Sequence, residues 1–183
     1  MATKNPSTPE AQFNSEMFRD INPRDINALK EKVIASPRNR YRLCLHADQS
    51  HHTQEMIICL KGFQYFQPHL HPEGRSESYH MIEGKMDIYL MDERGEVVET
   101  IELVAPHNLA KDSCQSFMYR LSAPMYHFTF PRSEWTVYHE VLTGPWSKEL
   151  VVNYAPFAPG EDDWEGVKEY VRKIAGYAFV DGQ

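Results

Sequence analysis

The stretch HLHPEGRSESYHMIEG, residues 69–84, places two histidines one residue apart and a glutamate six positions after the second. Side chains alternate between the two faces of a β-strand, so His69 and His71 are predicted to point the same way. Across a short loop that contains Pro72 and Gly74, Glu77 can meet them. Imidazole and carboxylate groups together suit Fe(II), Mn(II), Ni(II), Zn(II) or Cu(II). The stretch is therefore either a histidine-rich polar turn or most of a metal site.

The sequence around this stretch predicts many short β-strands. From residue 40 to about 155 it consists of short runs rich in β-branched and aromatic residues, broken by Gly, Pro, Asp or Ser. DERGE at 92–96 is typical of a hairpin turn. Strands at this spacing predict an antiparallel sandwich or barrel.

A later run, PMYHFTF at residues 124–130, offers a fourth ligand. His127 shares a strand face with Met125 and Thr129. The opposite face carries three aromatic residues and needs a cover, either a partner subunit or the terminal helices. These residues are Tyr126, Phe128 and Phe130.

Helices are predicted on both sides of the β-rich region. In NPRDINALKEKVIASP, Asn22 can cap the helix and Pro23 suits its first position. Near the C-terminus, apolar residues from Trp164 to Ile174 share one face, and Gly176 can end the helix. The predicted organisation is a flexible arm at 1–20, a main domain with its leading helix at 21–160, and a C-terminal helical extension at 161–183.

Composition excludes several classes of function. The formal net charge of −7 does not favour binding to nucleic acid or to an anionic membrane surface. The chain has no apolar run near the ~20 residues that a membrane span needs, and its N-terminus does not resemble a secretory signal. Three widely spaced cysteines do not form a disulfide framework. We therefore expect a cytoplasmic protein that acts on a small molecule.

Residues 69–84 resemble the first motif of the cupin superfamily, which is His-X-His, a short loop, Glu, and Gly. SAPMYH at 122–127 resembles the second motif, although it has Ala-Pro where cupins often have Pro-X-Gly. The resemblance implies an all-β fold, a double-stranded β-helix or jelly-roll barrel, with the two predicted helices added. It also implies a divalent ion, Fe, Zn, Mn or Ni, held by His69, His71, Glu77 and His127. Cupins commonly form dimers, so a homodimer is expected.

Three further segments look like WbuC-family cupin metalloproteins. They are SPRNRYRLCLH at 36–46, PHLHP at 68–72 and APFAP at 155–159. That family is associated with bacterial surface-polysaccharide gene clusters, which implies a sugar or nucleotide sugar as substrate. The likeness covers roughly residues 36–160, so the C-terminal helix lies beyond it.

Residues for binding and proton transfer are less clearly indicated. Arg42 shares a strand face with His46; if that face points inward, Arg42 can bind an anionic ligand at the pocket mouth. If it points outward, Arg42 is solvated or paired with an acidic residue. His46, Gln67 and Met125 are further candidates for substrate contacts. The nearest candidates for a catalytic acid or base are Tyr65, Tyr79 and Glu83.

Two other histidines near this region, His80 and His139, are predicted to have other locations. His80 is expected on the opposite strand face from Glu77, at the surface or an interface. His139 is interpreted either as a core histidine or as an outer hydrogen-bond partner of a metal ligand.

Two functions remain open from the sequence. A metal with free coordination positions supports isomerase, epimerase or lyase chemistry, or dioxygenase chemistry with Fe(II). The alternative is a non-catalytic module that binds a small molecule through its metal.

Overall fold

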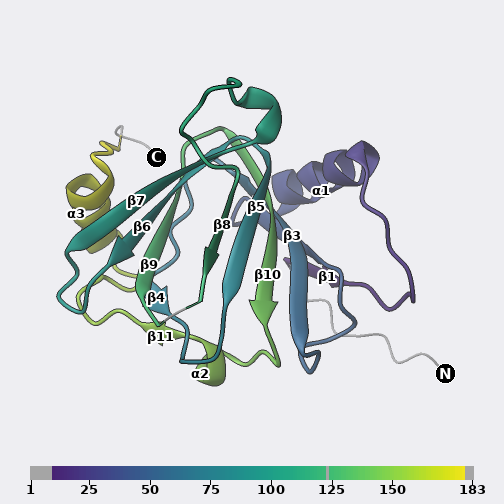
Figure 1. Ribbon diagram of the computed structural model, residues 1–183, viewed down its shortest axis with the longest axis horizontal. Coiled ribbons are helices and arrows are strands. Elements are labelled where there is room, and N and C mark those ends of the chain that lie inside the picture. Colours follow the sequence, from purple (N-terminus) through teal and green to yellow (C-terminus); the bar gives the residue numbers. More distant parts are fainter. Residues whose placement is uncertain (1–9, 123, 180–183) are drawn as a thin grey trace.

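The computed structural model describes residues 10–122 and 124–179, most of which lie in two facing β-sheets (Figure 1). One sheet has the strand order β1-β2-β3-β10-β5-β8, and the other has the order β11-β4-β9-β6-β7. The first sheet comprises β1 (Ala11–Phe13), β2 (Arg40–Cys44), β3 (Thr53–Lys61), β10 (Trp135–Thr143), β5 (Glu77–Glu83) and β8 (Met118–Leu121). The second comprises β11 (Asn153–Tyr154), β4 (His69–Leu70), β9 (Tyr126–Pro131), β6 (Lys85–Met91) and β7 (Val97–Val104).

The eight strands from β3 to β10 have the connectivity of a jelly roll. Four of them form the order β3-β10-β5-β8 and the other four form β4-β9-β6-β7, and the pairs within these two sets are antiparallel. This is the two-sheet arrangement that closes two Greek keys around one core. The predicted all-β, antiparallel class is confirmed, and so is the predicted hairpin at 92–96, which joins β6 to β7.

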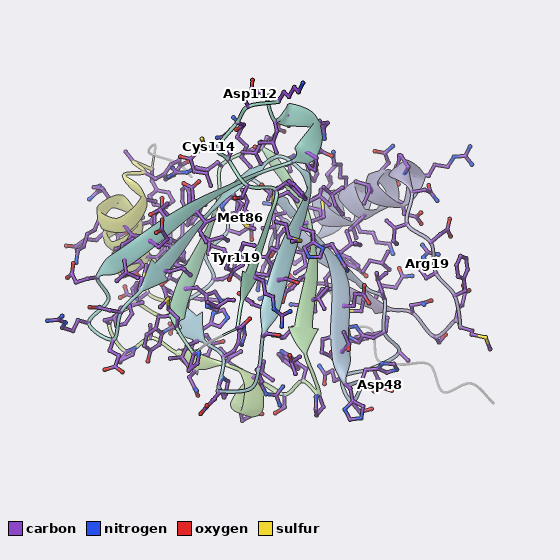
Figure 2. The ribbon with its side chains drawn as sticks, viewed as in Figure 1. Arg19, Asp48, Met86, Asp112, Cys114 and Tyr119 are labelled. Carbon is purple, nitrogen blue, oxygen red and sulfur yellow. The ribbon has the colours of Figure 1, made fainter. Side chains whose placement is uncertain are left out.

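Apolar side chains from both sheets meet between them. Met86 and Ile88 of β6 are fully buried against Tyr79 and Met81 of β5, with Leu103 of β7 beside them. Figure 2 shows Met86 and Tyr119 within the sandwich, whereas Asp112 and Cys114 lie in the loop that follows β7. Three histidines lie near β4 and β9, beside this apolar cluster.

Helix α1 (Pro23–Ala35) begins as the sequence predicts. The Asn22 side chain accepts a hydrogen bond from the backbone of Arg24, and the Asp25 side chain accepts one from the backbone of Asn22. Such a capping box satisfies backbone donors that a helix start leaves free. Leu29 and Val33 are buried against β2, β3 and β10, so α1 lies on the outer face of the first sheet.

Helix α3 (Trp164–Ala175) covers the aromatic face of β9. Val167 and Val171 are fully buried against Phe128 and Phe130, and Gly176 ends the helix in the left-handed conformation. Figure 1 places α3 on the opposite side of the sandwich from α1. The terminal helix, one of the two covers expected from the sequence, therefore lies over this face.

Truncating the helix side of this contact should lower stability. Val171→Ala removes two methyl groups from a fully buried position, at about 0.8 kcal/mol each, and leaves a small cavity. We expect the free energy of unfolding to fall by about 2 kcal/mol in urea denaturation. Glu169→Ala, an exposed position on the same helix, is the control and should change it by less than about 0.5 kcal/mol. Equal stabilities of the two variants would contradict the packing described here.

The chain ends differ in part from the predicted organisation. Residues 10–20, expected to belong to a loose arm, include β1, which pairs in parallel with β2; residues 1–9 and 180–183 lie outside the described residues. Two short helical turns complete the fold, η1 (Pro106–Asn108) and α2 (Lys148–Val151). Within the described residues, every helix is too short or too polar to span a bilayer.

Candidate metal centre

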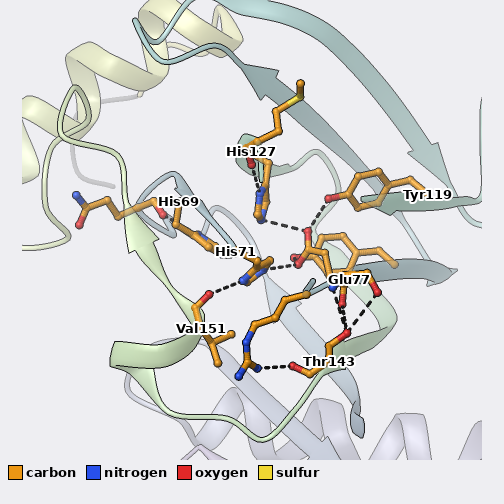
Figure 3. Close-up of polar contacts among 12 residues, drawn as sticks. His69, His71, Glu77, Tyr119, His127, Thr143 and Val151 are labelled. Atoms are coloured by element: carbon orange, nitrogen blue, oxygen red, sulfur yellow. Dashed lines mark hydrogen bonds and ion pairs between the residues drawn. The ribbon is translucent and has the colours of Figure 1, made fainter. Parts of the chain in front are cut away.

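Three histidines converge at the end of the sandwich where β4 and β9 pair. His69 of β4 stands directly opposite His127 of β9, and His71 follows β4 immediately. One ring nitrogen from each of the three lies within 4.8 Å of the other two. Figure 3 shows the three rings and the Glu77 carboxylate turned toward a common point.

Backbone carbonyls fix which nitrogen of each ring is free. The Nδ1 atoms of His69, His71 and His127 lie 3.1, 2.7 and 3.3 Å from the carbonyl oxygens of Gln67, Val151 and Met125, respectively. A carbonyl oxygen can only accept, so each Nδ1 carries the proton and donates it. In the neutral ring this leaves the lone pair on Nε2, and such an outer hydrogen bond is typical of histidines that bind a metal.

Glu77 completes the cluster from β5. Its carboxylate is 1% exposed; one oxygen lies 3.1 Å from His71 Nε2 and the other 3.1 Å from His127 Nε2. Tyr79 and Tyr119 donate hydroxyl hydrogen bonds to it, at 3.0 and 2.5 Å. Two ligand atoms that each lie about 2.1 Å from one ion, at a right angle, are about 3 Å apart, so these separations suit a shared ion.

One atom in this cluster lacks a protein partner. His127 is fully buried, and its Nε2 has no hydrogen bond within the described part of the chain, because its 3.1 Å contact with Glu77 lacks hydrogen-bond geometry. Leaving a buried polar atom unsatisfied costs about 1–3 kcal/mol. A divalent cation bound by the three Nε2 lone pairs would remove this cost, so the residues present fit a metal.

The charges around the site also favour a cation. Burial opposes ionisation of Glu77, but the His127 and His71 rings offset it, and the pKa of Glu77 is lowered. Burial lowers the pKa of His69 to about 3 and also lowers that of His127, so both rings stay neutral. For His71, burial is outweighed by its hydrogen bond and attraction to Glu77, and its pKa is raised. A metal ion would therefore compete with a proton at His71.

A cavity of about 190 Å³ opens beside the cluster. Its polar lining includes Tyr79, Thr129, Glu140 and Arg42, and also Arg40, which forms an ion pair with the buried Glu10. The remaining lining is mainly apolar, with Met56, Ile58, Leu60, Phe66 and Leu142. The cluster therefore borders a small, largely apolar cavity that also carries acidic and basic side chains.

Tyr79 and Arg42 are the predicted binding or catalytic residues that line this cavity. Burial and the charge of Glu77 raise the pKa of Tyr79 well above its ordinary value. Its hydroxyl therefore keeps its proton and holds Glu77 in place, and this geometry gives no support for proton transfer by Tyr79. Arg42 is an exposed residue of β2 whose side chain borders this cavity, so a role in binding an anion stays a prediction.

The other predicted residues lie outside the lining of the cavity. Tyr65 and Gln67 precede β4 in a segment without strand structure, so strand alternation does not place them on the same face as His69. Their side chains instead donate hydrogen bonds to the carbonyls of Pro159, Ala155 and Ala158. They hold the APFAP segment against the sandwich.

Glu83, Met125 and His46 are also placed elsewhere. A register shift in the β5–β10 pair turns Glu83 toward α1, where it forms an ion pair with Lys30 at 2.6 Å. Met125 contributes its carbonyl to His127, but its side chain is not part of the lining. His46 lines a neighbouring cavity of about 200 Å³, together with Arg42.

Glu140 is the residue that the sequence reasoning missed. It lies on the central strand β10 and lines the cavity together with the three histidines. Burial, and then the charge of Glu77, raises its pKa to about 7, although Arg42 opposes the shift. The signal was present in the sequence, because Glu140 alternates with His139 and must take the other face of the strand. His139 itself faces outward, away from the cluster.

The fold and the cluster together define a jelly-roll protein with a three-histidine site that can hold a divalent metal. The chain matches a family model described as "Domain of unknown function (DUF6016)" over residues 21–103, which is less than half of its length. No curated protein matches it.

Solved structures show only a distant likeness. Protein SO0799 from Shewanella oneidensis has a TM-score of 0.45 and 10% identity, over 56% of this chain and 61% of its own. The cupin domain of Schizosaccharomyces pombe Cnp3 has a TM-score of 0.41 and 7% identity, over 57% and 60%. The conserved SPY1581 protein from Streptococcus pyogenes has 0.46 and 13%, over 73% and 95%. This chain thus spans about three fifths of the first two, and likeness at this level assigns no function.

Proposed function

We propose that this protein is a cupin-type metalloenzyme that acts on a small anionic metabolite. The observation that carries the proposal is the convergence of three Nε2 lone pairs and the Glu77 carboxylate, beside a cavity that also holds Glu140. The jelly-roll strand order and the two cupin-like motifs support a double-stranded β-helix of the cupin type. Three imidazoles and one carboxylate suit Fe, Zn, Mn or Ni, with His69, His71, His127 and Glu77 as the proposed ligands.

The proposed division of roles follows from the contacts. A bound divalent ion would polarise a carbonyl or acidify a bound water. Tyr79 and Tyr119 hold Glu77 in its position through their hydroxyls. Glu140 is a buried carboxyl group in the lining of the same cavity, so it is suited to accept and return a proton there, and Arg42 is suited to bind a carboxylate. An open ligand position together with a proton-transfer group favours an isomerase, epimerase or lyase.

Cavity size narrows the substrate class. A volume of about 190 Å³ is below the roughly 300–1,000 Å³ of sites for drug-sized ligands. This volume favours a ligand smaller than a whole nucleotide sugar. A small hydroxy acid, keto acid or single sugar acid fits the volume and places a carboxylate near Arg42. The sugar acid also agrees with the polysaccharide association that the WbuC resemblance implies.

Removing Arg42 should weaken the binding of such an anion. A hydrogen bond to a charged group contributes about 1.5–3 kcal/mol, so Arg42→Ala should raise the Kd of a small hydroxy acid about 10- to 100-fold in calorimetric titration. Arg24→Ala, an exposed arginine of α1, is the matched control and should leave the Kd unchanged. If the two variants bind equally well, the assignment of Arg42 to the ligand is wrong.

A substrate screen tests the enzymatic role. Protein loaded separately with Fe(II), Mn(II), Ni(II) and Zn(II) is incubated with small hydroxy, keto and sugar acids, and products are followed by mass spectrometry. Proton exchange with solvent is followed by NMR. We expect turnover or exchange of at least one acid that binds. Measurable binding without either, under all four metals, would favour the alternative function, a non-catalytic module that holds a small molecule through its metal.

A further inference from the structure

A second group of histidines lies on the outer face of the first sheet, in a groove beside α1. His80 of β5 and His139 of β10 stand directly opposite each other in the strand register. They line a cavity of about 660 Å³, which α1 borders through Pro23 and Ile26. Nothing in the proposed function uses this groove, because its residues face away from the three-histidine cluster.

The two rings are close enough to share an ion. Their Nδ1 atoms are 3.3 Å apart, and their planes meet at 67°. Two nitrogens that each lie about 2.0–2.1 Å from a zinc ion, at the tetrahedral angle, are about 3.3–3.4 Å apart. Without an ion, this contact is a hydrogen bond between the two rings. The same separation also fits two ligands on one tetrahedral ion, and the cross-strand pairing of β5 and β10 holds it.

Glu55 of β3 prepares His139 for this role. Its carboxylate lies 2.9 Å from His139 Nε2, and because a carboxylate accepts, Nε2 carries the proton and Nδ1 keeps its lone pair. A carboxylate behind a ligating histidine is the outer arrangement typical of zinc sites. A hydrogen-bonded carboxylate therefore orients one of the two proposed ligands, His139.

The charges of the groove also favour a cation. Glu55 and Glu83 line it, and none of its described lining residues is Lys or Arg, although Lys30 neutralises Glu83 from one side. A metal ion in this groove would therefore lie near the negative charge of Glu55, which no Lys or Arg of the described lining neutralises.

We propose that His80 and His139 form a second site for a divalent metal of the Zn(II), Ni(II) or Cu(II) type. Two protein nitrogens make a weaker site than three, and the remaining positions are open to water or to a small ligand in the groove. The site binds more weakly than the interior cluster and does not depend on it.

Zinc titration of the full chain, free of any affinity tag, tests this site. Bound zinc is measured by equilibrium dialysis and elemental analysis for the wild type, His80→Ala, His139→Ala and the control His52→Ala, an exposed histidine of a polar loop. We expect two ions in the wild type and in the control, and one in each of the two groove variants. Glu55→Gln should retain the second ion with affinity weakened about 10- to 100-fold.

The outcomes separate this site from the interior one. His71→Ala should lose the tighter ion and keep the weaker one, whereas His80→Ala should do the reverse. If the interior cluster binds no metal, the wild type takes one ion and His80→Ala takes none, so the second site is still tested. Circular dichroism confirms that each variant is folded. Folded His80→Ala and His139→Ala proteins that bind zinc as the His52→Ala control does would overturn the proposal.

Discussion

The His71→Ala protein is expected to lose its tightly bound metal. His71 is 5% exposed, and its ring is fixed by a 2.7 Å hydrogen bond from Nδ1 to the carbonyl of Val151. Changing an outer partner of a metal ligand typically costs 10–100-fold in affinity, and removing a ligand should cost more. We therefore expect the Kd for Zn(II) at the interior site to rise more than about 100-fold, as measured by competition with a chelator of known affinity.

Two further variants make this result interpretable. His107→Ala changes an exposed histidine of η1 and should bind zinc as the wild type does. Because His71→Ala also leaves the Glu77 charge buried without its partner, His69→Ala provides a second ligand deletion at a less buried position. If folded His71→Ala and His69→Ala proteins both keep wild-type affinity, the ligand set is wrong.

Glu140→Gln is expected to abolish most of the turnover while leaving the metal bound. The substitution keeps the size and shape of the side chain but removes the group proposed to move a proton. General acid–base catalysis typically contributes 10²–10⁴-fold, so kcat should fall by about that factor for whichever acid the screen identifies. Metal content should equal that of the wild type. Glu99→Gln, on the exposed part of β7, is the control. A variant with full turnover would remove Glu140 from the mechanism.

Glu140→Gln should also change how the free energy of unfolding depends on pH, which can be measured without a substrate. In the metal-free protein, burial and the charge of Glu77 raise the pKa of Glu140 from 4.5 to about 7, so the folded state holds its proton more tightly than the unfolded state. Its contribution to the free energy of unfolding is present below about pH 4.5 and is lost as pH rises through about 7. Glu140→Gln cannot ionise and should gain stability relative to the wild type between pH 5 and 8. A difference that does not change with pH, in urea denaturation with a chelator present, would contradict the raised pKa.

The sequence was sufficient where a residue's environment depends on local spacing. The capping residues of α1, the left-handed Gly176 and the hairpin at 92–96 follow from short-range preferences. His69 and His71 share a side because one residue separates them. That His127 would stand opposite His69 depends on how β4 pairs with β9, a long-range contact. The strand pattern offered His127 only as a candidate, and the resemblance to a known motif specified it as a ligand.

Expectations failed where the backbone departed from regular strand geometry. Tyr65 and Gln67 were expected beside the metal ligands, but the strand begins only at His69. The irregular register near Val137 turns Glu83 toward α1 and away from the cluster. Strand alternation puts Glu140 on the opposite face from His139, but alternation does not say which of the two faces is buried. The raised pKa of Glu140 arises from burial and from Glu77 of a neighbouring strand, so spacing along the chain could not reveal it.

Anomalous diffraction from crystals grown with Zn(II) tests the central claim most directly. Data collected on both sides of the zinc absorption edge locate the ion without reference to any assumed chemistry. The account predicts a strong peak about 2.0–2.2 Å from Nε2 of His69, His71 and His127, with an oxygen of Glu77 at a similar distance. Zinc-soaked crystals that show no peak among these three rings, with the rings placed as described here, would contradict it.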